Sequence, residues 1–344
     1  MEDHHSPTIG IIPGVRGLGG PASFHEKFAD GVTRQGYKLT YDLNQPDLDA
    51  VLVIAGSRHL NLLRRVKNRG VPIIQRLDGM NWIHRARWTG IKHYLRSEVN
   101  NWILKVIRNH IASRIIYQSR FSREWWERKY GPLDKPTAVI YNGIDLARYT
   151  PPRDISPISD GIRVLLVEGH LKNGLEQGLF NAVNAMQEWR SHLGLPILLS
   201  AAGDIPESIQ RKVESRLPGR FQWLGILPRQ GVMREMQRSH IFLSVEMNPA
   251  CPNSIIEALA CGLPVLGWEN GAIRELVDEK SGALIPYGGN VWKGEPASTE
   301  GFLEKANSLV DHLAEFRQGA RRRAEECFSL DDMLAKYLQV ILSR

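Results

Sequence analysis

Short apolar runs alternate with longer amphipathic patterns along the chain, and this rhythm constrains the fold more than any other feature. Six runs in the first 150 residues have the length and composition of strands: IGII (9–12), KLTYDL (38–43), AVLVIAG (50–56), VPIIQRL (71–77), RIIYQS (114–119) and TAVIYN (137–142). Strands that alternate with helices favour βαβ units and a parallel sheet. The sequence therefore predicts an α/β fold of the doubly wound type.

A proline-rich segment divides this rhythm into two halves. TPPRDISPISDG (150–161) holds three prolines, and strand-like runs such as RVLLVEG, PILLSAAG and HIFLSV follow it. We expect two Rossmann-like domains facing a central cleft, over residues 1–150 and 151–328. Residues 329–344 are expected to form a helix that packs back toward the first domain. Folds of this kind bind ligands at the carboxyl ends of their strands.

Composition narrows the functional classes. The chain of 344 residues is 42% hydrophobic and has no apolar run of about 18 residues, so no transmembrane helix is expected. MEDHHSPTIG lacks the basic and apolar regions of a signal peptide, which favours a cytoplasmic protein. The three cysteines have no metal-type spacing and are expected to be free thiols.

The positive charge is unevenly distributed. Residues 85–129 hold eleven Lys and Arg against three acids, a local excess that accounts for the whole net charge of +7. Tryptophans 82, 88, 102, 125 and 126 lie in or beside this stretch. Cations mixed with tryptophan suit an anionic membrane surface. The other interpretation is a solvated helix face above core tryptophans, and a nucleic-acid partner is not expected.

The stretch NPACPNSIIEALACGLPVLGW (248–268) combines a helix pattern with one acid, Glu257. A helix is expected from about Asn253, with Asn253 as N-cap or Pro252 at the first position, and Gly262 should end it. The free N–H groups of Ser254 and Ile255 would favour a phosphate. Glu257 shares a face with Asn253, one turn on, where it could accept hydrogen bonds from a ribose. The alternative is an ordinary α/β helix with a solvent-facing Glu.

Several motifs resemble those of one enzyme family. CPNSIIEALACGLPVLGWENGAIREL, GVRGLGGPASF and VIYNGIDLARYTP occur in the order found in retaining GT-B glycosyltransferases of family 4 (glycosyl transferases group 1), and the resemblance covers essentially the whole chain. It implies a metal-independent enzyme without cofactor that transfers a sugar from a UDP- or GDP-sugar to a glycan or lipid-linked acceptor. A role in cell-envelope polysaccharide synthesis, at the inner face of the membrane, would fit.

The resemblance also implies roles for individual residues. The implied donor ligands are Gly19, Gly20, Gly225, Asn253, Ser254, Ile255 and Glu257. Lys172 matches the lysine that neutralises the leaving diphosphate, and His170 stands where the family has arginine. Asp78 would lie near the reacting sugar, unless it only forms an Asp-Gly turn. The family's first acid of E-x7-E is replaced by Pro249, so that backbone groups near Cys251 are expected to hold the sugar.

Other interpretations compete with this one. Gly17-x-Gly19-x-x-Ala22, with Asp42 after the next strand, also fits a dinucleotide-binding enzyme. Loss of the first acid would fit a donor-binding protein without turnover. Asp47-Leu48-Asp49 matches a metal motif but is expected to be a turn.

Three weaker candidates complete the sequence analysis. Arg76 and His84 are candidates for the acceptor site. The segment 270–275 resembles a loop near the donor, in which Glu275 could instead cap a helix or pair with Arg274.

Overall fold

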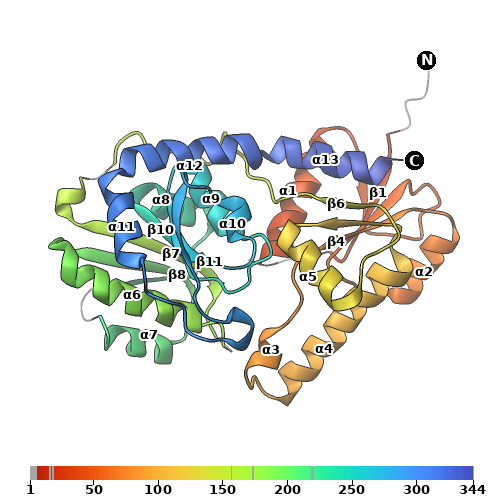
Figure 1. The fold of residues 1–344 in the computed structure, drawn as a ribbon. Coiled ribbons are helices and arrows are strands. Elements are labelled where there is room, and N and C mark those ends of the chain that lie inside the picture. Colours follow the sequence, from red (N-terminus) through yellow and green to blue (C-terminus); the bar gives the residue numbers. More distant parts are fainter. Residues whose placement is uncertain are drawn as a thin grey trace. The chain divides into compact units, whose positions relative to one another are not determined.

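The computed structural model describes residues 6–14, 17, 19–155, 157–172, 174–217 and 221–343. The chain divides into two compact units (Figure 1). Unit 1 comprises the residues up to Asn81, Gly90–Gly143 and the residues from Leu330 onward. Unit 2 comprises Trp82–Thr89 and Ile144–Ser329. Each unit is built around its own parallel sheet, so the predicted doubly wound α/β fold is confirmed.

Unit 1 holds a six-stranded sheet of order β2-β1-β3-β4-β5-β6. The strands are β1 (Thr8–Ile12), β2 (Lys38–Thr40), β3 (Ala50–Ile54), β4 (Ile73–Leu77), β5 (Arg114–Tyr117) and β6 (Thr137–Val139). All pairs are parallel. The strand order reverses between β1 and β3, which is where a doubly wound sheet opens a crevice for ligands.

Helices cover both faces of this sheet. One face packs against α1 (Gly20–Arg34) and α13 (Leu330–Leu342), as Figure 1 shows. The other packs against α2 (Leu60–Asn68), α4 (Ile91–Val106), a π-helical turn (Ile107–Ile111) and α5 (Arg120–Tyr130). The C-terminal helix α13 thus belongs to the core of unit 1 although the chain reaches it last.

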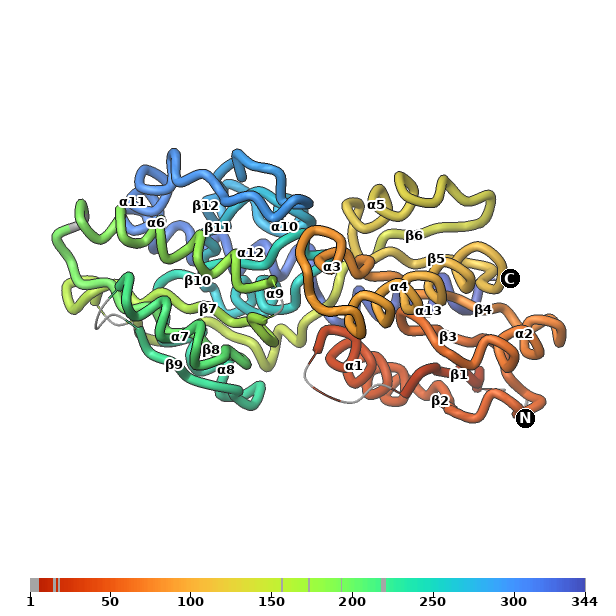
Figure 2. Tube along the Cα trace, turned by 90° about the horizontal axis from the view of Figure 1, so that it is seen from below, coloured from red at the N-terminus to blue at the C-terminus, as the bar shows by residue number. Residues whose placement is uncertain are grey.

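Unit 2 repeats the plan with the order β12-β11-β10-β7-β8-β9 (Figure 2). Its strands are β7 (Ile162–His170), β8 (Ile197–Asp204), β9 (Phe221–Gly225), β10 (Ile241–Ser244), β11 (Val265–Glu269) and β12 (Gly282–Pro286). Helices α6 (Gln177–Leu193), α7 (Glu207–Glu214) and α11 (Phe302–Asp311) pack on one face. Helices α8 (Arg229–Arg238), α9 (Asn253–Ala260) and α12 (Leu313–Cys327) cover the other. The strand order reverses between β7 and β10.

One short segment of unit 2 comes from the middle of the unit 1 sequence. It contains α3 (Ile83–Ala86), and Ile83 is buried in the unit 2 core. The Trp82 ring meets Trp292 edge-on at 5.3 Å between centroids. Arg87 donates to the side chain of Gln177 at 2.9 Å and to the carbonyl of Gly294 at 3.0 Å. Residues 82–89 are therefore an integral part of unit 2.

Candidate functional site

The helix α9 follows β10 and runs from Asn253 to Ala260. Its N-cap is Pro252, without a side-chain hydrogen bond, so Asn253 is the first helical residue and not the cap. At the other end Gly262 has φ +64°, and Leu263 N–H donates to the carbonyl of Ala258 at 2.9 Å. This is the left-handed termination predicted for Gly262.

Only three side chains of α9 escape full burial: Asn253, Ser254 and Glu257. The remaining five, including Ile255, are buried in the core of unit 2. Side chains three and four residues apart are neighbours on a helix, so Ser254 and Asn253 both lie beside Glu257, and the predicted common face of Asn253 and Glu257 is present. Ile255 has only its backbone amide to offer a ligand, because its side chain is committed to the core.

Glu257 lies in an enclosed setting. Burial raises the pKa of the Tyr149 hydroxyl, and the negative charge of the Glu257 carboxylate raises it further. Burial and, to a smaller extent, the charge of Glu257 also raise the pKa of the Cys261 thiol, to about 12. Arg321 donates to the carbonyls of Ala260 at 2.8 Å and Tyr149 at 2.6 Å, placing a cation at the negative end of α9. These neighbours argue against an ordinary Glu that merely faces solvent.

The loop between β10 and α9 is clipped to the loop after β11. Asn248, with φ +50°, donates its N–H to the side chain of Asn270 at 2.6 Å. Ala272 N–H donates to the carbonyl of Pro249 at 2.8 Å. A Cβ on Gly271 would collide with Pro249. Pro249 is thus a buried part of a fixed loop, at the position where the resembling family carries an acid.

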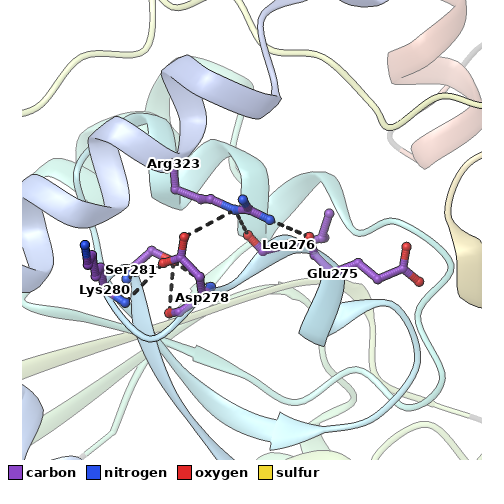
Figure 3. A network of polar contacts seen from close by, with 6 residues as sticks. All are labelled: Glu275, Leu276, Asp278, Lys280, Ser281 and Arg323. Carbon is purple, nitrogen blue, oxygen red and sulfur yellow. Dashed lines mark hydrogen bonds and ion pairs between the residues drawn. The ribbon is translucent and has the colours of Figure 1, made fainter.

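A second network fixes the far end of the same loop, after the short helix α10 (Ile273–Leu276). Arg323 donates to the carbonyls of Glu275 at 2.8 Å and Leu276 at 3.0 Å (Figure 3). The side chain of Glu275 points away from Arg323 in this view. Arg274 pairs with Glu269 at 3.6 Å. The segment 270–275 is therefore held at both ends.

Two carboxylates that the sequence analysis did not select lie at the switch point of the unit 2 sheet. Glu168 is near the carboxyl end of β7, and Glu246 follows the adjacent β10 by two residues. Burial, together with the charge of Glu246, raises the pKa of Glu168 well above its ordinary value. Burial raises the pKa of Glu246 to about 7. The sequence signal was present, because each acid directly follows an apolar strand run in RVLLVEG and HIFLSVE.

Glycines hold the backbone of both acids in place. Gly203, with φ +142°, leaves no room for a Cβ because one would overlap the carbonyl oxygen of Glu168. A Cβ on Gly178 would overlap the carbonyl oxygen of Val245, the residue before Glu246. Neither carboxylate has a hydrogen-bonding side chain among the residues that the structure describes. Two carboxyl groups with raised pKa values thus lie at the ends of neighbouring strands, and the described residues supply neither with an ion pair.

The predicted cations lie at the end of β7 and just beyond it. His170 is exposed and pairs in register with Asp204 of β8. Lys172 donates to the Asp204 carboxylate at 2.6 Å. The hydrogen bond from Lys172 lowers the pKa of Asp204. The positive charge of Lys172 and, to a smaller extent, His170 lower it further. Lys172 would therefore have to break its ion pair with Asp204 in order to bind a diphosphate.

Another cation approaches this loop from outside the predicted motif. A Cβ on Gly174 would lie 3.3 Å from the Arg87 side chain and 3.0 Å from Ile83. Asn173, between Lys172 and Gly174, lies outside the described residues. No local sequence pattern could have found Arg87, because it is more than eighty residues away along the chain.

The predicted glycines fall in different units. Gly225 ends the edge strand β9, is exposed and has φ +61°. Gly19 is the N-cap of α1 in unit 1 and Gly20 its first residue, and both are exposed. Val15, Arg16 and Leu18 of the same glycine loop lie outside the described residues. The structure therefore gathers Gly225 with the unit 2 residues at one sheet edge, and Gly19 and Gly20 at the corresponding edge of unit 1.

Asp78 follows β4 at the carboxyl edge of unit 1. Its carbonyl accepts hydrogen bonds from Trp126 Nε1 at 2.7 Å and Ser122 Oγ at 3.1 Å. Burial raises the pKa of the Asp78 carboxyl, and the charge of Arg76 partly offsets this. Gly79 is required by packing, since a Cβ there would press on the Trp125 ring. Asp78 and Gly79 thus contribute to packing in unit 1, whether or not Asp78 also contacts a ligand.

The two weaker acceptor candidates are both buried, in different units. Arg76 donates to the Asn142 side chain at 2.8 Å, and its guanidinium lies 3.9 Å from the centre of the Phe24 ring. His84 is buried in unit 2. Neither side chain presents a surface to an acceptor.

The acids of the competing motifs have local partners. Asp42 accepts from the N–H of Asn44 at 3.0 Å, and Asp49 accepts from the N–H of Thr8 at 2.7 Å. Asp42 thus closes a turn just after β2, at the carboxyl edge of the sheet, whereas Asp49 ties the start of β3 to the start of β1, at the opposite edge. The expectation that Asp47-Leu48-Asp49 is a turn agrees with this arrangement.

One family model matches part of the chain. Residues 162–310 match the family model of glycosyl transferases group 1. A 2-deoxystreptamine N-acetyl-D-glucosaminyltransferase of Streptomyces fradiae is 28% identical over 120 residues, which are 34% of this chain and 28% of that protein. The chain thus spans less than a third of the length of this curated relative.

Solved structures resemble the chain over nearly its full length. Sucrose-phosphate synthase of Thermosynechococcus elongatus has a TM-score of 0.74 at 14% identity, covering 97% of this chain and 98% of its own. HepE of Anabaena, solved with UDP and glucose, has a TM-score of 0.70 at 15% identity, covering 98% and 99%. The chain has the GT-B fold. The residues of its second unit that match the glycosyl transferases group 1 model include α9 and both acids of the switch point.

Proposed function

We propose that this protein is a retaining glycosyltransferase that moves a sugar from a nucleotide-diphosphate sugar to a glycan or lipid-linked acceptor. The observation that carries the proposal is the single polar face of α9, formed by Asn253, Ser254 and Glu257 on an otherwise buried helix. That helix lies within the residues that match the group 1 model.

The donor binds at the start of α9. A helix N-terminus offers N–H groups that have no acceptor within the helix, and its dipole favours an anion. Ser254 and Ile255 contribute such amides, and α9 has no acid in its first turn to compete with a diphosphate. Glu257 lies one turn further and accepts from the ribose hydroxyls. Gly225 contacts the base with its backbone. The donor is a UDP- or GDP-sugar, in line with the UDP-glucose complex of HepE.

Transfer then requires stabilisation of the departing diphosphate. The acceptor oxygen bonds to the anomeric carbon on the face from which the phosphate oxygen leaves. The acceptor proton passes to that phosphate oxygen, so that charge and atoms balance. Amides of α9, Lys172 and His170 stabilise the growing negative charge, the kind of electrostatic contribution that dominates many enzymes. These groups supply positive charge from the chain itself, so the proposed reaction uses no metal ion and no cofactor.

The acceptor binds unit 1. Gly19 and Gly20 allow close approach of a ligand to the backbone at the start of α1, and Asp78 lies at the same edge of the sheet after β4. No helix in the described part of the chain is long and apolar enough to cross a bilayer. A lipid-linked acceptor at the cytoplasmic face of a membrane, in cell-envelope polysaccharide synthesis, fits the basic stretch of residues 85–129.

The donor site is tested by binding before any acceptor is known. Thermal-shift screening against UDP-, GDP- and ADP-sugars should select one nucleotide, and calorimetry should then give its Kd. Glu257→Gln should raise that Kd about 10- to 100-fold, because hydrogen bonds to a charged group contribute about 1.5–3 kcal/mol. Glu300→Gln is the control, because it changes an exposed acid of unit 2 outside the candidate site, and it should leave the Kd unchanged.

Three outcomes would count against parts of the proposal. Unchanged affinity in Glu257→Gln would refute the ribose contact. Donor binding without hydrolysis or transfer to any acceptor would favour a binding protein without turnover. Stabilisation by NAD and not by any nucleotide sugar would favour the dinucleotide-binding alternative.

A further inference from the structure

The helix α4 has one face buried in unit 1 and one face that is exposed. Ser97, Asn101, Ile103 and Leu104 are buried against the unit 1 core. Apolar side chains also line the outward face, and their exposed fractions are large: Ile91 57%, Tyr94 37%, Leu95 57%, Val99 50% and Trp102 55%. Spacings of four, four and three from Ile91 to Trp102 place them in one stripe. We call this stripe the α4 apolar face.

This face is unusual within the molecule. Nine large apolar side chains stand exposed among the described residues, and five of them lie on α4. Scattered exposed apolar residues need no explanation, but a contiguous group of this kind marks an interaction surface.

The neighbouring helix α5 shows what an ordinary outward face of unit 1 looks like. Its exposed residues are charged: Arg120, Arg123, Glu124, Arg128 and Lys129. Its Trp126 is fully buried, as is Arg108 before it, which donates to the Tyr117 hydroxyl at 3.0 Å. In the α5 part of the basic, Trp-rich stretch 85–129, the charges are therefore solvated and Trp126 belongs to the core. Within this stretch, α4 remains as the candidate membrane surface.

Charge beside the α4 apolar face identifies its partner. Lys92 and Arg96 are exposed and flank the stripe on one side. Glu98 is half-buried and is the only acid of the helix. A helix with a tryptophan-containing apolar face, a basic flank and little acid suits the interface of an anionic bilayer. The stripe from Ile91 to Trp102 is about 16 Å long, short enough to lie in the headgroup plane and too short to span.

We propose that α4 inserts its apolar face into the surface of an anionic membrane, with Lys92 and Arg96 at the phosphate level and Trp102 at the acyl boundary. The docking surface belongs to unit 1 alone. It does not depend on the proposed transfer reaction, so either proposal can fail without the other.

Flotation of the full-length protein with vesicles tests the surface. The probe is a vesicle of phosphatidylcholine with about 30% phosphatidylglycerol. Vesicles of the same size made of phosphatidylcholine alone serve for comparison. The wild type should float with the anionic vesicles at low salt, and the bound fraction should fall at least tenfold in Leu95→Glu/Trp102→Glu. The matched control is Ile226→Glu, which charges a side chain of similar exposure (60%) in unit 2 and should bind like the wild type.

Two further measurements separate insertion from its alternatives. Lys92→Gln/Arg96→Gln should weaken binding to anionic vesicles several-fold and remove its salt dependence. Brominated lipids should quench tryptophan emission in the wild type more than in Trp102→Phe. The proposal is overturned if Leu95→Glu/Trp102→Glu floats like the wild type. It is also overturned if sedimentation without lipid shows a dimer that this variant dissociates, because the face would then be covered by a second copy of the chain.

Discussion

The carboxyl edges of the two sheets have the same topology and opposite chemistry. In unit 1 the strands at the switch point, β1 and β3, lead into Pro13-Gly14 and Ala55-Gly56, with no charge. The neighbouring strand β4 carries Arg76, which is buried against Phe24 and bonded to Asn142, and Asp78 follows this strand. In unit 2 Glu168 lies near the end of β7, and Glu246 follows β10 by two residues. The same fold thus accommodates a switch point without charge in unit 1 and a pair of acids with raised pKa values in unit 2.

This difference separates what the fold requires from what a site requires. Apolar strands and covering helices suffice to build either sheet. Two carboxylates held together without a countercharge destabilise the unit that contains them, because each raises the energy of ionising the other. Such a conflict between local chemistry and stability is typical of functional sites. Unit 2 is accordingly the unit where substitutions should separate stability from activity.

The largest effect is expected from Gly203→Ala. A Cβ there would overlap a backbone oxygen that cannot move aside, and φ +142° is strained for alanine. We expect a loss of about 3 kcal/mol or more in unit 2 stability, measured by calorimetry. Gly56→Ala is the control in unit 1, where the new methyl would meet only side-chain atoms, of Leu104 at 3.0 Å and Ile103 at 3.4 Å. Equal losses would show that the unit 2 edge is no more constrained than that of unit 1.

Lys172→Ala should next affect the reaction and not the fold. The Lys172–Asp204 pair is exposed, so its removal should leave the melting temperature nearly unchanged. Turnover should fall about 100-fold if Lys172 stabilises the leaving diphosphate. Asp204→Asn retains the lysine and removes its competitor for the diphosphate, so it should lower donor KM. A Lys172→Ala enzyme with full kcat would remove this residue from the proposed mechanism.

The acid pair should make the stability of unit 2 depend on pH. Glu246 has a native pKa raised to about 7, so between about pH 4.5 and 7 the native state binds more protons than the unfolded state. Stability therefore decreases as pH rises through this window and stays low above it. Glu246→Gln should flatten the profile and stabilise the protein by about 1–2 kcal/mol at pH 8.

Asp78→Asn is the matched change in unit 1. The pKa of Asp78 is also raised by burial, but Arg76 offsets part of that shift, so the pH profile should change less than with Glu246→Gln. The denaturant midpoint at pH 5 and at pH 8 measures both variants. A larger effect at Asp78 would reverse the comparison between the two sheet edges.

The sequence predicted most of the fold and part of the site. Alternating apolar runs and turn residues are local signals, so both doubly wound units and the termination of α9 at Gly262 were predictable. The pairing of Glu168 with Glu246 depends on β10 lying beside β7, which the order of strands along the chain does not reveal. The contacts of Arg87 in unit 2 depend on residues 82–89 joining that unit. The Asn253 cap was wrong because Pro252, with its extended backbone, already occupies that position.

The smallest effect concerns the two helix starts that follow strands at these edges. In unit 1 the Ser119 hydroxyl caps α5 by accepting from Ser122 N–H at 3.0 Å, so Ser119→Ala should cost about 1 kcal/mol. The start of α9 has no side-chain cap, so Asn253→Ala should change stability by less than about 0.5 kcal/mol and should instead weaken donor binding. Urea unfolding and donor titration of both variants decide the matter. If Asn253→Ala destabilises the protein as much as Ser119→Ala while donor binding is unaffected, Asn253 serves the helix itself, and only the backbone amides of α9 remain for the diphosphate.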